Sequence, residues 1–400
     1  MEKIKNPIVA LFDLDGVLIQ PGGYRAAVAA TVNYFSQKMG LGEQAPNEDD
    51  LAFLEANGIT SEWDMVPICL VVLIQKASQA ANVVLPDCSI EDLMLLVRAL
   101  GISIDVNYRS EIRQMLPFLI TLSIPPSEGL LNAIQAGKIF PGHQNAAFIR
   151  DLLGNTRQIT DSKTLRVFQN FILGDRGFVD AYSLIPEFET QSFLRMNDVC
   201  LLSEESQRIL YKLISDSMIK PAVITARPSL PPAGVDDLLN DYSPEAEMAI
   251  QLTGLDGIPV VGFGTIQFLA RQIGTSPDSL IKPSPVQALT AIMAAFGETM
   301  IRSLEWAAAN SIDGGDHQDA SQLPSRFTLN IFEDSAKGIQ ACQQAAFILR
   351  QKGCEATVKA WGIARNQDKI KALEAVGAQV FPDVNQAIQA AFSSILGSFS

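Results

Sequence analysis

Residues 9–18 of this 400-residue chain have the sequence VALFDLDGVL, and the organisation of the other residues follows from this stretch. Its first four residues are apolar and have β-propensity, which predicts a buried strand. Asp13 and Asp15 stand two residues apart at the end of that strand, so both carboxylates can leave the same face at its carboxyl edge. Two carboxylates in this arrangement suit a cation and a phosphoryl group.

The composition is that of an ordered globular protein and excludes several classes of function. Hydrophobic residues make up 48% of the chain and charged residues 18%, whereas disorder requires low hydrophobicity and high net charge. The net charge of −14 leaves no basic surface for nucleic acid or an anionic membrane, so we expect small or cation-neutralised substrates. The only histidines are His143 and His317, so a histidine-based zinc site and a Ser-His-Asp triad are both disfavoured.

Other features of the sequence predict a cytoplasmic protein. The five cysteines stand singly in apolar segments, with no Cys-x-x-Cys pair, as expected of buried thiols in a reducing compartment. The first strand begins too close to Met1 to leave room for a signal peptide. The most apolar window, Met65–Ile74, falls well short of the ~20 residues that span a bilayer.

The pattern of apolar residues divides the chain into two parts. Across residues 22–198 the spacing is helical, as at Val28 and Val32, which lie on one face of a helix. After residue 198 short apolar strands alternate with helices, which predicts a parallel sheet covered on both faces. Because the first strand precedes the helical part, we predict a doubly wound, Rossmann-like α/β domain of residues 1–21 and 199–400. A large helical domain of residues 22–198 is inserted into it.

Polar side chains mark the predicted strand ends of the α/β domain, where doubly wound sheets bind their ligands. They are Asp13 with Asp15, Thr225 in VITAR, Lys282 in KPSP, and Glu333 with Asp334 in FEDSAKG. Brought together, the four carboxylates and one ammonium carry a net charge of −3, which raises carboxylate pKa values by repulsion. A divalent cation reduces this charge to −1, and carboxylate and phosphate oxygens suit Mg²⁺.

Taken in order, these four segments resemble the four motifs of the haloacid dehalogenase-like hydrolases. The resemblance implies that Asp13 is a nucleophile that forms an aspartyl-phosphate. It implies that Asp15 protonates the leaving oxygen and then activates water. Dehalogenases lack an aspartate at the position of Asp15, so dehalogenation is disfavoured.

The same resemblance assigns binding roles to residues of all four motifs. Thr225 and Ala226 would bind the phosphoryl oxygens, and Lys282 would neutralise their charge. The metal site would consist of Asp13, the backbone carbonyl of Asp15, and either Glu333 or Asp334.

Two arginines lie just beyond strand-end motifs, and the sequence leaves their roles open. Arg25 and Arg227 are each suited to a substrate anion or to a plain surface salt bridge. The inserted segment is much larger than the small helical caps with which we compare it, and it contains no motif that identifies a substrate.

We therefore expect a Mg²⁺-dependent phosphomonoester hydrolase that acts on a small phosphorylated metabolite. A phosphomutase of the β-phosphoglucomutase type uses the same four motifs and stays as the first alternative. A non-catalytic sensor of phosphorylated ligands is the second, and it is disfavoured because all four catalytic positions are filled. The substrate and the oligomeric state stay open.

Overall fold

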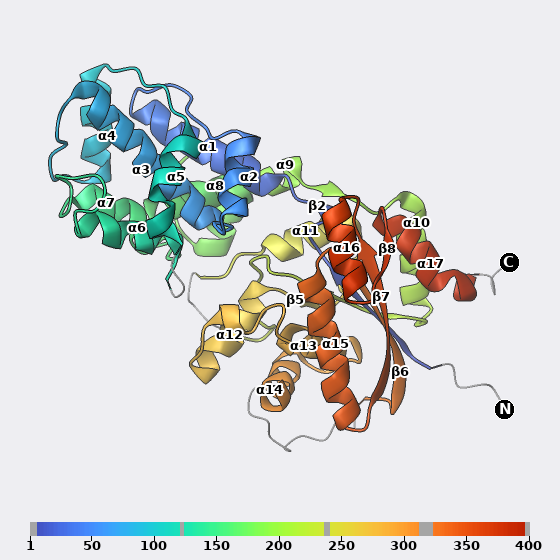
Figure 1. Ribbon diagram of the computed structural model, residues 1–400. Coiled ribbons are helices and arrows are strands. Elements are labelled where there is room, and N and C mark those ends of the chain that lie inside the picture. The colour runs from blue at the N-terminus through green and yellow to red at the C-terminus, as the bar shows by residue number, and fades with distance from the viewer. Residues whose placement is uncertain (1–5, 121–123, 236–240, 312–322, 397–400) are drawn as a thin grey trace, which may run out of the picture. The chain divides into compact units, whose positions relative to one another are not determined.

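The structure is a computed structural model, and it describes residues 6–120, 124–235, 241–311 and 323–396 (Figure 1). The chain divides into two compact units. Met1–Pro21 and Asp198–Ser400 form the sheet unit, and Gly22–Asn197 forms the helical unit. These boundaries lie within one residue of the predicted ones.

A six-stranded parallel sheet forms the centre of the sheet unit, with strand order β5-β4-β1-β6-β7-β8 (Figure 1). The strands are β1 (Ile8–Asp13), β4 (Lys220–Ile224), β5 (Val260–Val261), β6 (Arg326–Glu333), β7 (Glu355–Ile363) and β8 (Gln379–Phe381). The chain adds strands on one side of β1 up to β5 and then on the other side from β6 onward. The reversal beside β1 is the position at which open α/β sheets bind ligands.

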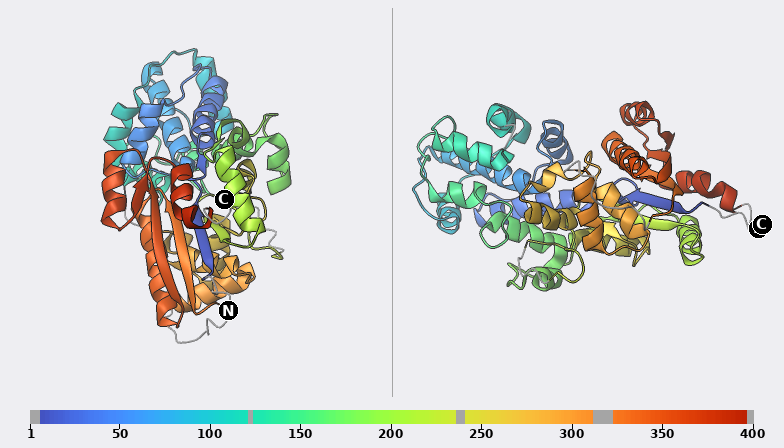
Figure 2. Two further views of the ribbon diagram at one scale, coloured as in Figure 1. Left: turned by 90° about the vertical axis from the view of Figure 1, so that its right-hand side faces the viewer. Right: turned by 90° about the horizontal axis from the view of Figure 1, so that it is seen from below.

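Helices cover both faces of this sheet (Figures 1 and 2). Along β1, Val9 and Leu11 belong to one buried cluster, whereas Ala10 and Phe12 belong to the other, as the period of two requires. The first cluster is completed by α12 (Phe263–Ile273), α13 (Val286–Ala295), α14 (Met300–Ser311), α15 (Ala336–Gln351) and α16 (Gln367–Ala375). The second is completed by α10 (Glu204–Ser215), α11 (Glu245–Thr253) and α17 (Val384–Leu396). The predicted doubly wound α/β fold is confirmed.

A second, two-stranded antiparallel sheet lies where the chain leaves and re-enters the sheet unit. Strand β2 (Ile19–Gln20) pairs with β3 (Val199–Cys200). The sequence analysis did not predict this ladder, because each strand has only two residues.

The helical unit is built around one buried helix, α3. Its helices are α1 (Gly23–Lys38), α2 (Glu48–Ala56), α3 (Glu62–Ala81), α4 (Ile90–Leu100), α5 (Tyr108–Leu119), α6 (Pro126–Gln135), α7 (Ala147–Leu153), α8 (Lys163–Tyr182) and α9 (Phe193–Asn197). Residues 65–74 of α3 are all buried, and α3 packs against α1, α5, α6, α7 and α8. A helix that is apolar on all sides is expected at the centre of such a bundle.

Helix α3 is longer than the ten-residue apolar window suggested. It has 20 residues, and by length and composition it is the one helix of the described chain that could cross a membrane. Its most apolar window has a mean hydropathy of 1.2, and 72% of that window is buried inside the structure. This burial is that of a core helix.

All five cysteines are free, but they are not all buried as predicted. Cys69, Cys342 and Cys354 are buried, whereas Cys88 and Cys200 are partly exposed.

Candidate active site

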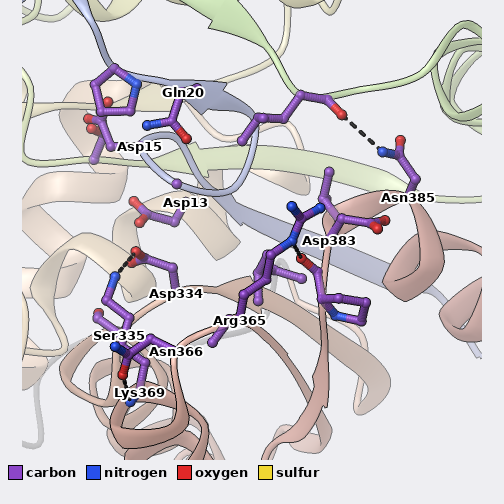
Figure 3. Close-up of a pocket in the computed structure, with 18 of the residues that line it drawn as sticks. Asp13, Asp15, Gln20, Asp334, Ser335, Arg365, Asn366, Lys369, Asp383 and Asn385 are labelled. Atoms are coloured by element: carbon purple, nitrogen blue, oxygen red, sulfur yellow. Dashed lines mark hydrogen bonds and ion pairs between the residues drawn. The ribbon is translucent and has the colours of Figure 1, made fainter.

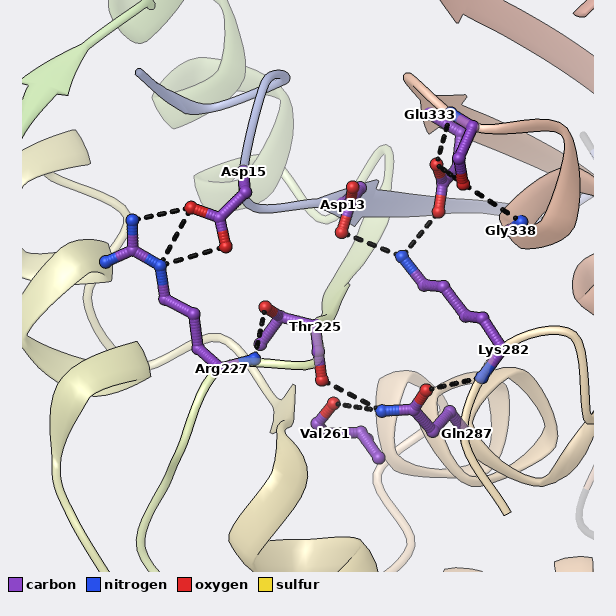
Figure 4. A network of polar contacts seen from close by, with 10 residues as sticks. Asp13, Asp15, Thr225, Arg227, Val261, Lys282, Gln287, Glu333 and Gly338 are labelled. Carbon is purple, nitrogen blue, oxygen red and sulfur yellow. Dashed lines mark hydrogen bonds and ion pairs between the residues drawn. The ribbon is translucent and has the colours of Figure 1, made fainter. Parts of the chain in front are cut away.

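The sheet brings the predicted strand-end residues to one edge. Asp13 is the last residue of β1, Thr225 directly follows β4, and Glu333 ends β6. Asp13 is in register with the last residue of β4, and the preceding residue of β1 is in register with the penultimate residue of β6. Figure 4 shows these side chains together with Lys282, which comes from the loop before α13.

Lys282 lies between two buried carboxylates. Its Nζ donates to Asp13 Oδ1 at 2.7 Å and to Glu333 Oε1 (Figure 4). Burial and the neighbouring Glu333 raise the pKa of Asp13 well above its usual range, and Lys282 opposes this shift. Burial lowers the pKa of Lys282, but the two carboxylates outweigh it and the net shift is upward. Lys282 is therefore an ammonium that holds Asp13 in place.

Gln287 fixes the loop that carries Lys282. This buried residue of α13 donates from Nε2 to the backbone carbonyls of Thr225 at 2.9 Å and Val261 at 3.3 Å. Its Oε1 accepts from the backbone N–H of Lys282 at 3.2 Å. Gln287 was not predicted as a site residue, although a glutamine in a helix that is otherwise almost entirely apolar is a signal in the sequence.

Glu333 and Asp334, which the sequence left as alternatives, have different surroundings. The Glu333 side chain is fully buried, and its Oε2 accepts from Ser335 N and Oγ, both at 2.9 Å. A Cβ at position 338 would lie 1.7 Å from Glu333 Oε1, so a glycine is required there. Asp334 instead lines the cavity described below. Burial raises the pKa of Asp334, and the ion pair with Lys369 opposes that shift.

Carboxylate oxygens of Asp13, Glu333 and Asp334 lie within 4.8 Å of one another, and this set fits a divalent cation. Mg²⁺ prefers oxygen ligands and takes only one or two carboxylates directly. Both oxygens of Glu333 already accept hydrogen bonds, whereas Asp13 and Asp334 face the cavity. The donor set therefore favours Asp13 and Asp334 as the direct ligands.

Gly16 allows the chain to turn close to Asp334. It has φ of +77°, which favours glycine, and a Cβ on it would lie 2.6 Å from Asp334 Oδ2. Position 16 therefore requires glycine both for its positive φ and for the close approach of the Asp334 carboxylate.

The two arginines lie in ion pairs. Arg227 is buried and bonds to Asp15 and Asp198, so its salt bridge is not the surface one of the second alternative. Arg25, in the helical unit, bonds to Glu48 at 2.6 Å and Glu55 at 2.8 Å.

The strand-end residues line a cavity of about 850 Å³, and the described residues around it all belong to the sheet unit (Figure 3). Asp13, Asp15, Thr225, Ala226, Lys282 and Asp334 form one part of its lining. The loops after β7 and β8, together with the first turns of α16 and α17, supply another wall, with the polar residues Arg365, Asn366, Lys369, Asp383 and Asn385. The sequence analysis missed this wall, although its loops follow two predicted strands and the same strand-end rule applies to them.

No protein-family model matches the chain, and no curated protein matches it in sequence. A solved structure does match over nearly the whole length. This X-ray structure of a structural-genomics target covers 98% of this chain and 99% of its own, with a TM-score of 0.67 at 15% identity. At this identity the likeness shows a shared fold.

Two other solved structures match more loosely. One is a phosphatase from Thermococcus thioreducens, with a TM-score of 0.39 at 15% identity over 91% of this chain and 98% of its own. The other is a hydrolase from Pseudomonas syringae, with a TM-score of 0.28 at 13% identity over 98% and 99%. With TM-scores this low, neither says anything about the activity of this chain.

Proposed function

We propose that this protein is a phosphomonoester hydrolase that works through an aspartyl-phosphate on Asp13. The observation that carries the proposal is the pair of Asp13 and Lys282, 2.7 Å apart at the carboxyl end of the parallel sheet and open to a polar cavity. A carboxylate beside a fixed ammonium is suited to attack a phosphoryl group whose charge the ammonium neutralises.

The reaction has two steps. In the first, an Asp13 oxygen forms a bond to phosphorus while the bond from phosphorus to the ester oxygen breaks, and Asp15 gives that oxygen a proton. In the second, Asp15 takes a proton from water, the water oxygen bonds to phosphorus, and the bond to Asp13 breaks to release inorganic phosphate. A positioned acid or base of this kind contributes ~10²–10⁴-fold in rate.

Other residues bind the phosphoryl group. Lys282 neutralises its charge, and Thr225 and Ala226 line the cavity beside it. Asp13 and Asp334 are the residues that would hold Mg²⁺, with the backbone carbonyl of Asp15 as a further ligand. Bound Mg²⁺ supplies positive charge that stabilises the phosphoryl oxygens during transfer.

We further propose that the helical unit acts as a cap that contacts the leaving group and determines substrate specificity. The residues of the strand ends all bind the phosphoryl group or the metal, so other residues must recognise the leaving group. The substrate class is a small phosphate ester, and a cytoplasmic location is part of the same proposal. Closure of a cap excludes water from the first step and opening releases product.

Phosphate release from a panel of sugar phosphates, nucleotides and small acid phosphates tests the proposal. Hydrolysis should require Mg²⁺ and stop with a chelator. Asp13→Asn should lower kcat by about 10³-fold or more, since it removes the nucleophile. Asp256→Asn, an exposed aspartate of the same unit, is the matched control and should keep full activity.

The same assay separates the alternatives. A mutase would transfer the phosphoryl group and release little phosphate, and a sensor would release none even in a single turnover. If Asp13→Asn kept more than a few per cent of the activity, Asp13 would not be the nucleophile.

A further inference from the structure

A buried arginine links Asp15 to a second aspartate beside the candidate active site. Arg227 Nε donates to the two oxygens of Asp15 at 2.8 and 2.9 Å, and its Nη2 donates to Oδ1 at 2.5 Å (Figure 4). Its Nη1 donates to Asp198 Oδ2 at 2.7 Å. The side chains of Arg227 and Asp198 are 2% and 0% exposed, whereas that of Asp15 is 35% exposed. Asp15 is thus the member of the group that reaches the cavity.

Stability alone is a poor explanation for this group. Removing charged groups from water is unfavourable, and buried ion pairs are often replaced by apolar residues without loss of stability. Here one guanidinium is shared by two carboxyl groups instead of forming a one-to-one ion pair. The guanidinium fixes the orientation of the carboxylate, because it is planar and donates two parallel hydrogen bonds, which a lysine ammonium does not.

The orientation that results suits phosphoryl transfer. The Asp13 carboxylate points to Lys282, and the Asp15 carboxylate points to Arg227, in a different direction (Figure 4). In phosphoryl transfer the attacking and leaving oxygens lie roughly in line through phosphorus. The nucleophile and the proton donor must therefore stand apart, on either side of the phosphoryl group.

Arg227 also contacts the phosphate-binding segment directly. Its backbone N–H donates to Thr225 Oγ1 at 3.1 Å, two residues earlier in the chain. Asp198, the buried partner, is the first residue of the sheet unit after the helical unit. Arg227 thereby connects the segment of Thr225 to Asp198 and Asp15, which lie 29 and 212 residues away from it in the sequence.

We propose that Arg227, held by Asp198, is a positioning residue that orients Asp15 towards the leaving oxygen. This inference rests on the proposed function, because it requires Asp15 to be the proton donor. Without the guanidinium the Asp15 side chain can rotate, and the proton is delivered less often in the productive geometry.

Leaving-group dependence provides the test. The variants Arg227→Lys and Asp198→Asn are compared with wild type on an alkyl phosphate and on para-nitrophenyl phosphate, whose leaving group departs unprotonated. We expect Arg227→Lys to lower kcat on the alkyl ester at least about tenfold, with KM nearly unchanged and a loss on the aryl ester of no more than about threefold. Asp198→Asn, which keeps the shape of the buried partner, should give a smaller loss with the same preference.

Three controls separate positioning from a structural effect. Arg271→Lys changes a partly buried arginine that pairs with Asp241 in the same unit, and it should leave both rates unchanged. Urea unfolding shows whether each variant is folded. In an Asp15→Asn background, Arg227→Lys should cause no further loss on the alkyl ester, because there is no proton donor left to orient.

Two results would overturn the inference. Arg227→Lys could slow both esters equally, or it could slow the alkyl ester as much in the Asp15→Asn background as in wild type. If Asp15→Asn alone is selective for the alkyl ester, then only the role of Arg227 is wrong. If Asp15→Asn slows both esters equally, the assignment of Asp15 in the proposed function is wrong, and this inference is wrong with it.

Discussion

Replacing Lys282 by methionine removes the ammonium that lies between two buried carboxylates and keeps most of the side-chain volume. Asp13 and Glu333 are 12% and 0% exposed in their side chains, and both accept hydrogen bonds from Lys282 Nζ. Breaking a buried ion pair by removal of one partner costs ~3–5 kcal/mol, because the remaining charge is left uncompensated. Glu333 keeps its two hydrogen bonds from Ser335, so we expect the lower end of this range, about 3 kcal/mol.

The loss is measured as the free energy of unfolding in urea, without Mg²⁺ and with a chelator. Fluorescence is recorded in a Trp63→Phe background, so that Trp306 and Trp361, both in the sheet unit, report the unfolding of that unit. The matched control is Lys369→Met, which also removes an ammonium from a carboxylate of the site. Lys369 is 58% exposed, and an exposed pair of this kind contributes only ~0–1 kcal/mol.

The free energy of unfolding of Lys282→Met is also measured with Mg²⁺ added. A cation that binds the folded state stabilises it by mass action, so Mg²⁺ should recover part of the stability that Lys282→Met loses. The reasoning is refuted if Lys282→Met lowers the free energy of unfolding by no more than Lys369→Met does. In that case the Lys282 charge would not be what holds the two carboxylates together.

Three further predictions follow from contacts in the site. Lys369→Met should tighten Mg²⁺ binding in a calorimetric titration, because Lys369 Nζ lies 2.7 Å from Asp334 Oδ2 and competes for that carboxylate; an unchanged or weaker affinity would contradict this. Gly338→Ala should lower the free energy of unfolding by about 1–3 kcal/mol, since its Cβ would overlap the Glu333 carboxylate, and an unchanged urea midpoint would show that the helix can shift at little cost. Gln287→Leu should also cost about 1–3 kcal/mol, because it leaves buried backbone groups unpaired, and kcat should fall with it; full stability and activity would assign the loop geometry to other contacts.

The fold could be predicted from the sequence where local pattern and tertiary burial agree. The alternation of strands and helices after residue 198 gave the parallel sheet, and the strand-end rule brought Asp13, Thr225 and Asp334 to one edge. Helix α14 was not among the predicted helices, although Leu304 and Trp306 lie on its buried side. Only two residues of the mainly apolar segment 258–263 form strand β5, since such a segment does not specify how much of it pairs.

The partners of the site residues could not be predicted in the same way. Arg227 lies 212 residues from Asp15 along the chain, and Lys282 lies 269 residues from Asp13. Local spacing carries no information on such pairs. The fold determines which strand ends are neighbours, but the direction in which each side chain points depends on packing. This is why the sequence left the role of Arg227 open and did not indicate its buried pairing with Asp15 and Asp198.

The short ladder of β2 and β3 means that the helical unit could be inserted or removed with little change to the sheet unit. Gln20 pairs with Val199, so the two chain ends that enclose the helical unit are already adjacent strands of an antiparallel pair. A two-residue β-turn such as Asn-Gly could join them directly and replace everything between, because antiparallel neighbours need no longer connection. The entropy of closing a loop rises only slowly with its length. The sheet unit can therefore accommodate insertions of very different size at this position, and removing the helical unit requires no rearrangement of the strands that remain.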